Sequence, residues 1–203
     1  MTSWWRESNW PRIILGAIAL FFIAAVVFPV FACRNERPHY GRCMSNLKQI
    51  GFAFAQYQAD YNEHLPPVAL GGSAYGWADA LAIYTSNKSS STFQCSSQKQ
   101  DAQPDPRLSQ YTDYWFDARL AGRVGIFFDQ PTRRIMGGEG NDGTDLTNAR
   151  YSVSALPPKW LGDSTSPLYR HLGMANYLFA DGHVKSLNPS QFSKSHLTYK
   201  SPF

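Results

Sequence analysis

A run of twenty residues without a charge, Ile13 to Ala32, constrains the fold of this chain more than any other feature of the sequence. At 1.5 Å per residue, a helix of this length measures about 30 Å, the thickness of the hydrocarbon core of a bilayer. Trp4, Trp5 and Trp10 precede the run, where aromatic rings favour the headgroup level. We therefore predict a transmembrane helix over residues 13–32, in preference to a buried core helix.

A cysteine directly follows this run and raises the question of cleavage. Val30 to Cys33 is similar to the cleavage site of a lipoprotein signal, but Phe31 is bulky where small residues are usual. The run is also longer than the apolar part of a signal peptide, which is about 7 to 15 residues. We therefore expect the anchor to stay attached to the rest of the chain.

The length of 203 residues allows one anchor and one domain, because single domains cluster at about 100 to 150 residues. The formal charge of +4 comes from scattered Lys and Arg and does not indicate a nucleic-acid partner. Pro38 and Gly41 should kink the chain between anchor and domain. The predicted parts are a cytoplasmic N-terminus 1–12, the transmembrane helix 13–32, a kinked connector 33–42 and an extracytoplasmic domain 43–203.

The domain begins with the pattern of an amphipathic helix. From Cys43 the apolar residues recur at alternating spacings of three and four, which places them on one helix face. A second, shorter helix is indicated by Trp77, Leu81 and Tyr84. The residues of the first stripe are Leu47, Ile50, Phe54, Tyr57 and Tyr61, followed by a break near Asn62.

Short apolar segments separated by turn residues follow, and they predict strands. Asp181-Gly182 between two such segments is typical of a type I′ hairpin, whose two central residues need positive φ angles. Helices first and strands later predict an α+β fold, with the amphipathic helix packed on an antiparallel sheet. The predicted strands are Tyr114 to Phe116, Ile126 to Phe128, Arg133 to Met136, Tyr151 to Val153, Asn176 to Ala180 and His183 to Leu187.

Four segments of the sequence carry a family resemblance. They are Cys43 with Asn46 to Gly51 (NLKQIG), Phe93 to Cys95 (FQC), Ile135 to Gly140 (IMGGEG), and His171 followed after nine residues by Asp181 and Gly182. In these segments the chain resembles bacterial pseudopilin-like proteins with a C-terminal H-x9-DG motif. The resemblance implies a pilin-like domain on the outer face of the cytoplasmic membrane.

The N-terminus departs from the pattern of that family. Aligning backwards from Phe28 puts Glu7, Ser8 and Arg12 where the family has the Gly, aromatic residue and Glu of a peptidase site. The resemblance therefore implies a degenerate, uncleavable N-terminus and a permanently anchored derivative.

The three cysteines allow at most one bridge within the chain. Cys43 and Cys95 both lie in segments that match the family, so the resemblance favours a disulfide between them, with two buried free thiols as the alternative. Closing a loop of about fifty residues would stabilise the fold by about 4 kcal/mol. For Cys33 we expect an inert interfacial thiol, with acylation or a bridge between chains as the alternatives.

Metal ligands are not evident from residue spacing. None of the five histidines has close ligand spacing with a cysteine, and no HExxH or CxxC occurs. We therefore predict no cofactor other than calcium, and expect His171 to form a hydrogen bond with the turn at Asp181 and Gly182. A Gly-rich, oxygen-rich loop is a candidate calcium site, as in some pseudopilin loops, with a solvated turn as the alternative. Its ligands would be Glu139, Asn141, Asp142 and Asp145.

The sequence lacks a nucleophile elbow, a phosphate-binding loop and a dinucleotide fingerprint, so we do not expect an enzyme or a small-molecule substrate. The resemblance implies a non-catalytic, membrane-anchored structural or assembly protein. The alternative is an accessory subunit of a large membrane complex, photosynthetic or respiratory, that reuses a pilin-like fold.

The expected partners are the lipid bilayer and other membrane-protein subunits, with Gly16 and Ala24 allowing a second helix to approach closely. Counting Lys and Arg near the predicted span would place the domain in the cytoplasm. The resemblance and the cysteine usage favour the opposite orientation. We expect the bacterial inner membrane, with the N-terminus inside and the domain outside.

Overall fold

A computed structural model of the chain describes residues 10–32, 36–68, 76–85, 90–97, 112–124, 128, 130–140 and 158–197. The chain divides into two compact units, Met1–Pro38 and His39–Phe203. The helices are α1 (Trp10–Ala32), α2 (Glu36–Asp60) and α3 (Trp77–Ala82), and the strands are β1 (Tyr114–Phe116), β2 (Ile135–Glu139), β3 (Ala175–Phe179) and β4 (Val184–Leu187). Short 3₁₀ helices occupy Ser90–Phe93, Ala118–Leu120, Pro131–Arg133, Pro158–Leu161, Pro167–Tyr169 and Lys194–Leu197.

Helix α1 contains the long apolar run, but the membrane anchor predicted for residues 13–32 is wrong for the structure as described. Among the described residues, no helix has the combination of length and apolarity that crossing a bilayer requires. The single-pass membrane assignment that rested on the anchor is corrected with it.

Helix α2 begins earlier than predicted. Residues 36–42, expected as part of a kinked connector, are helical, and neither Pro38 nor Gly41 interrupts the helix. Pro38 is tolerated because it lies in the first turn, where the backbone N–H groups have no partner within the helix. The predicted stripe is confirmed from Leu47 to Tyr57, since its residues there are at most 9% exposed, but Tyr61 lies beyond the end of the helix and is 49% exposed.

The four strands form one antiparallel sheet in the order β1-β2-β3-β4, each strand pairing with the next along the chain. Tyr114 lies opposite Glu139 in the β1–β2 pair, and Tyr177 lies opposite Lys185 in the β3–β4 pair. Helices and an antiparallel sheet confirm the α+β part of the predicted fold class. Of the other predicted strands, residues 126–127 and 151–153 lie outside the described residues.

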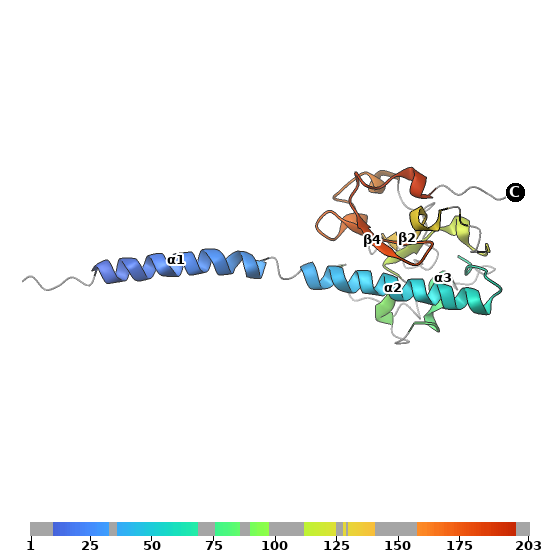
Figure 1. Cartoon of the computed structure of the whole chain (residues 1–203), viewed down its shortest axis with the longest axis horizontal. Coiled ribbons are helices and arrows are strands. Elements are labelled where there is room, and N and C mark those ends of the chain that lie inside the picture. The colour runs from blue at the N-terminus through green and yellow to red at the C-terminus, as the bar shows by residue number, and fades with distance from the viewer. Residues whose placement is uncertain are drawn as a thin grey trace, which may run out of the picture. The chain divides into compact units, whose positions relative to one another are not determined.

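Both faces of the sheet are covered (Figure 1). On one face α2 and α3 pack against Tyr114, Phe116 and Leu178, which belong to the larger apolar cluster. On the other face Trp115 and Tyr177 pack with the segments after residue 158 in a second cluster. Because successive strand residues point to opposite faces, one strand supplies both clusters.

The turn between β3 and β4 differs from the predicted type I′ turn. Of its two central residues only Gly182 has a positive φ, of 85°. The N–H of Gly182 donates to the Phe179 carbonyl, and the N–H of Phe179 donates to the His183 carbonyl. The loop therefore contains Ala180, Asp181 and Gly182, as in three-residue hairpins that end with a glycine in the left-handed region.

Candidate functional site

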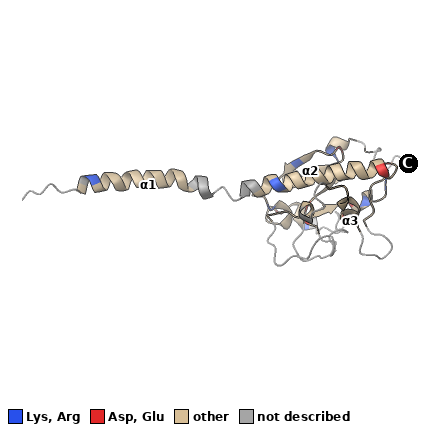
Figure 2. Cartoon of the chain, turned by 90° about the horizontal axis from the view of Figure 1, so that it is seen from below, with Lys and Arg blue, Asp and Glu red and all other residues tan. Residues whose placement is uncertain are grey.

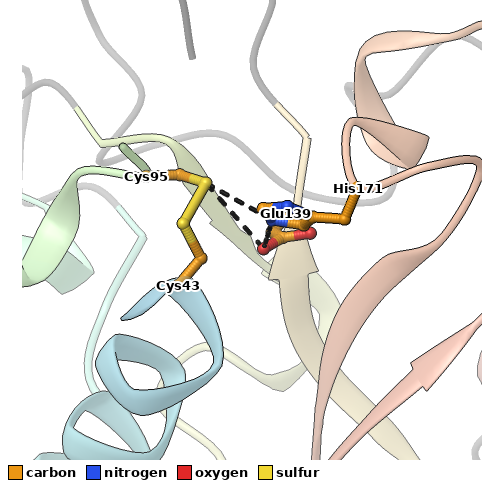
Figure 3. Close-up of side chains that lie close together, drawn as sticks. All are labelled: Cys43, Cys95, Glu139 and His171. Carbon is orange, nitrogen blue, oxygen red and sulfur yellow. Dashed lines mark hydrogen bonds and ion pairs between the residues drawn. A yellow bond between two sulfur atoms is a disulfide. The ribbon is translucent and has the colours of Figure 1, made fainter. Parts of the chain in front are cut away.

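Four buried side chains with metal-binding or redox chemistry meet where α2 and the sheet come together (Figure 3). Cys43 lies in α2, Cys95 follows a 3₁₀ helix, Glu139 ends β2 and His171 precedes β3. All four residues are at most 3% exposed. We call these four residues the Cys–Glu–His cluster.

A disulfide joins Cys43 and Cys95 within the cluster, as the resemblance predicted, with their Cα atoms 5.1 Å apart and a sequence separation of 52. The side-chain amide of Asn46 donates to the Gln94 carbonyl at 2.8 Å, and the N–H of Cys95 donates to Asp113 at 2.6 Å. The first bond holds α2 against residue 94 independently of the bridge, and the second holds Cys95 against the residue that precedes β1.

Glu139 places a carboxylate in the interior, beside the disulfide. Its Oε1 accepts hydrogen bonds from His171 Nε2 at 2.8 Å and from the Asn176 side chain at 2.9 Å. Its Oε2 accepts a bond from the Asn176 backbone N–H at 2.9 Å. Three donors satisfy a carboxylate that solvent does not reach, as buried charged groups require. Burial and then the Glu139 charge also hold the pKa of Tyr114 well above its ordinary value.

His171 is held in position by a tight turn and by contacts on both sides of its ring. The backbone groups of His171 and Met174 bond to each other, and the two residues between them, Leu172 and Gly173, have φ angles of 54° and 79°. The His171 Nδ1 lies 3.3 Å from Ser97 Oγ. The Tyr40 ring meets the imidazole edge to face, with centroids 5.6 Å apart.

The cluster brings sulfur, nitrogen and oxygen ligand atoms together. One ligand atom from each of the four residues lies within 4.8 Å of every other. Cysteine, histidine and glutamate are the residues that hold Zn²⁺ and related transition metals. As a disulfide, by contrast, the pair is shielded, because exchange needs a thiolate to reach one of the sulfur atoms.

Other predicted contacts of these residues are corrected. His171 does not form the predicted hydrogen bond with the turn at Asp181 and Gly182. It bonds to Glu139, and Asp181 instead lies 2.5 Å from Nδ1 of His183. Glu139, a predicted calcium ligand, is occupied by His171 and Asn176. The other predicted calcium ligands, Asn141, Asp142 and Asp145, lie outside the described residues.

Sequence reasoning missed the proximity of the disulfide to Glu139 and His171, and it missed Asn176 entirely. The four cluster residues come from four separate segments, so no short spacing links them. One available signal was the position of Glu139, a single carboxylate at the end of the apolar strand segment IMGGE. A buried strand that ends in a charge requires partners in the folded protein.

The surface of α1 is a second candidate site. Leu20, Phe21, Phe22 and Ile23 are between 61% and 71% exposed. Four consecutive residues at about 100° each take up most of the circumference of a helix, so α1 is apolar on all sides. Arg12 is the one charged residue of α1, and the helix is otherwise uncharged along its length (Figure 2). A Cβ at Gly16 would meet nothing within 4 Å.

Comparison with protein-family models, with curated proteins and with solved structures found no match to this chain.

Proposed function

We propose that this chain is a non-catalytic structural protein that assembles with other copies of itself through α1, in the manner of pseudopilin-like proteins. The observation that carries the proposal is the exposed, apolar surface on every side of α1. Fully burying one large apolar side chain stabilises by about 1.5 to 3 kcal/mol. Eleven such residues are exposed along the helix after Trp10: Ile13, Ile14, Leu15, Ile18, Leu20, Phe21, Phe22, Ile23, Val26, Val27 and Phe28.

The distribution of these side chains favours several neighbours. A helix that packs on one partner needs a single apolar stripe, whereas a helix that is apolar all round belongs in an interior. Copies of the same chain would supply identical helices on every side. Gly16 and Ala24 lie on this surface, and small residues let helix backbones approach closely.

The domain supports a structural role in a different way. Its disulfide joins α2 to Cys95, and hydrogen bonds join Glu139 of β2 to His171 and to β3, so these contacts form one joint in the interior. Such a joint resists separation of the two layers, which suits a protein that carries load in an assembly.

A second candidate function is an accessory subunit of a large complex made of other proteins. Arg12 favours it, because the first turn of α1 has no acidic residue that could pair with Arg12 of an identical helix in register. A different partner could provide that acidic residue.

The test measures the oligomeric state of the full chain in mild detergent by light scattering and cross-linking. We expect oligomers that dissociate in the double variant Gly16→Leu with Ala24→Leu, because Leu keeps the surface apolar but blocks close approach. The matched control is Ile14→Leu with Ile23→Leu, which changes neither apolarity nor volume and should leave the oligomers intact.

Three outcomes would overturn self-assembly. A monomeric chain that co-purifies with fixed amounts of other proteins would favour the accessory subunit. A monomeric chain that floats with lipid vesicles would show that lipid covers the apolar surface. Oligomers that persist unchanged in the Gly16 and Ala24 double variant would exclude this helix surface as the contact.

A further inference from the structure

We propose that Cys43, Cys95, Glu139 and His171 form a tetrahedral transition-metal site, of the type that binds Zn²⁺, when the disulfide is reduced. These residues would then connect α2 to the rest of the domain in two ways. Under oxidising conditions the connection is the covalent bridge, and under reducing conditions it is the metal. This inference is independent of self-assembly through α1.

Two of the distances between ligand atoms lie close to those of such a site, and the hydrogen-bonded atoms His171 Nε2 and Glu139 Oε1, 2.8 Å apart, would have to separate to reach them. Zinc bonds of about 2.3 Å to sulfur and about 2.0 to 2.2 Å to nitrogen and oxygen give tetrahedral edges of roughly 3.4 to 3.8 Å. Cys95 Sγ lies 3.5 Å from His171 Nε2 and 4.0 Å from Glu139 Oε1. Reduction would let the two sulfur atoms separate from bonding distance to an edge of this length.

The residues behind the ligands suit a metal site as well. Metal-bound imidazoles usually donate their second N–H to a nearby acceptor, and Ser97 Oγ lies 3.3 Å from Nδ1 of His171. Metal-bound carboxylates are in turn hydrogen-bonded, and Asn176 donates to both oxygens of Glu139. His171 and Glu139 therefore have supporting contacts that would hold them in place around a cation.

A disulfide alone gives no reason for a buried His–Glu pair beside it. Burying such polar groups costs free energy, and apolar residues of similar size often serve stability better. The chain holds a comparable pair at its surface, where the side chains of His183 and Asp181 are 40% and 29% exposed. The buried pair differs in having two sulfur atoms next to it.

Metal binding begins with reduction of the disulfide. A dithiol reductant gives two electrons and two protons to the bond between Cys43 and Cys95, and itself becomes a disulfide. Binding of the divalent cation then releases one proton from each of the two thiols. The neutral imidazole of His171 gives up the proton that Nε2 donates to Glu139, takes up a proton on Nδ1, which faces Ser97, and binds through Nε2. Glu139 binds as the carboxylate.

The test uses Co²⁺ as the probe, because its thiolate complexes absorb visible and near-ultraviolet light. In a Cys33→Ala background, the full chain is reduced with a phosphine or dithiol and titrated with Co²⁺. We expect one Co²⁺ per chain, with sulfur-to-cobalt charge-transfer absorption that disappears when Zn²⁺ is added. The oxidised chain should show no such absorption.

Variants assign the ligands. Glu139→Gln and His171→Ala should each weaken Co²⁺ binding by about tenfold or more. The matched control is His183→Ala, which removes the exposed histidine of the comparable pair and should leave binding unchanged. A measurement that needs no variant is alkylation of the reduced wild-type chain, in which Zn²⁺ should slow modification of Cys43 and Cys95 but not of Cys33.

The proposal is overturned if the reduced chain gives no charge-transfer absorption, or if Zn²⁺ leaves alkylation of Cys43 and Cys95 unchanged. It is equally overturned if folded Glu139→Gln and His171→Ala variants bind Co²⁺ as tightly as the unsubstituted chain. A reduced chain that unfolds and does not regain its structure with Zn²⁺ also contradicts it.

Discussion

Helices α1 and α2 have nearly the same length, 23 and 25 residues, but bury their side chains in opposite ways. In α2 one stripe is buried against the sheet, while Phe52 on another side of the helix is 70% exposed. In α1 four consecutive apolar residues are exposed. The apolar residues of α2 lie on the side that packs on the sheet, whereas those of α1 lie on every side, which is why we proposed partners all round α1. The following predictions test whether this difference holds.

The largest effect is expected from removing a buried leucine of α2. Leu47→Ala should lower the free energy of unfolding of the domain by about 2 to 5 kcal/mol, because Leu47 is 1% exposed and its loss leaves a cavity. Leu20→Ala in α1, where the side chain is 70% exposed, should change it by less than about 0.5 kcal/mol. Denaturant unfolding followed by near-ultraviolet circular dichroism measures both. Equal losses would mean that α1 packs on the domain.

The next effect concerns the hairpin that packs on α2. Gly182→Val should cost about 1 to 3 kcal/mol, because a β-branched residue is strained at a φ of 85°. A Cβ at this position would meet nothing within 4 Å, so the loss would come from the backbone alone. Gly182→Asn is the control and should cost much less, since Asn tolerates this conformation. Thermal unfolding compares the two, and an equal melting temperature for Gly182→Val and the wild type would contradict the turn assignment.

Two glycines within α2 lie in different surroundings: Gly51 faces the sheet, and Gly41 has open space where a Cβ would be. A Cβ at Gly51 would lie 2.9 Å from Leu178 Cδ1, so Gly51→Ala should lower stability by about 1 kcal/mol through overpacking. A Cβ at Gly41 would meet nothing within 4 Å. Gly41→Ala should therefore raise the free energy of unfolding by about 0.5 to 1 kcal/mol, because Ala favours the helix. Gly16→Ala in α1 should leave the unfolding of the domain unchanged. A stabilising Gly51→Ala would show that the α2–sheet contact is loose.

The smallest effect lies at the end of α2. Tyr84 donates a hydrogen bond to Asp60 at 2.7 Å, and this bond raises the pKa of Tyr84 to about 12. Because the pKa is raised in the folded chain, the hydrogen bond between Tyr84 and Asp60 contributes fully to stability below about pH 10. This contribution is lost as the pH rises through about 12. NMR titration of labelled tyrosine rings measures the pKa. Asp60→Asn should return it toward the ordinary value, and an unchanged pKa would contradict the assigned cause.

Local patterns in the sequence predicted most of the domain. The stripe of α2 was predicted because periodicity reports which side of a helix is buried, and strand β1 because it is a short apolar segment between turn residues. The start of α2 was missed because proline is read as a helix breaker, although the first turn tolerates Pro38. The membrane anchor, which was predicted from a run of apolar residues, was wrong for the described part of the chain.

The candidate site was less predictable, because its residues are brought together by the fold. The disulfide followed from the family resemblance. The contact of Glu139 with His171 depends on how β2 ends against the turn before β3, and no spacing in the sequence encodes that geometry. The hydrogen bond predicted for His171 was wrong for the same reason: its actual partner, Glu139, is 32 residues away.

The position of the disulfide along the chain has a consequence for the order of folding. The bridge closes a loop that contains most of α2 and all of α3, and every strand of the sheet comes after it. Each strand pairs with the next, so the sheet can form from neighbouring segments once the loop is closed. During synthesis the helical half is therefore able to oxidise before the first strand emerges. Docking of this loop on the sheet then brings Glu139 and His171 next to the bridge.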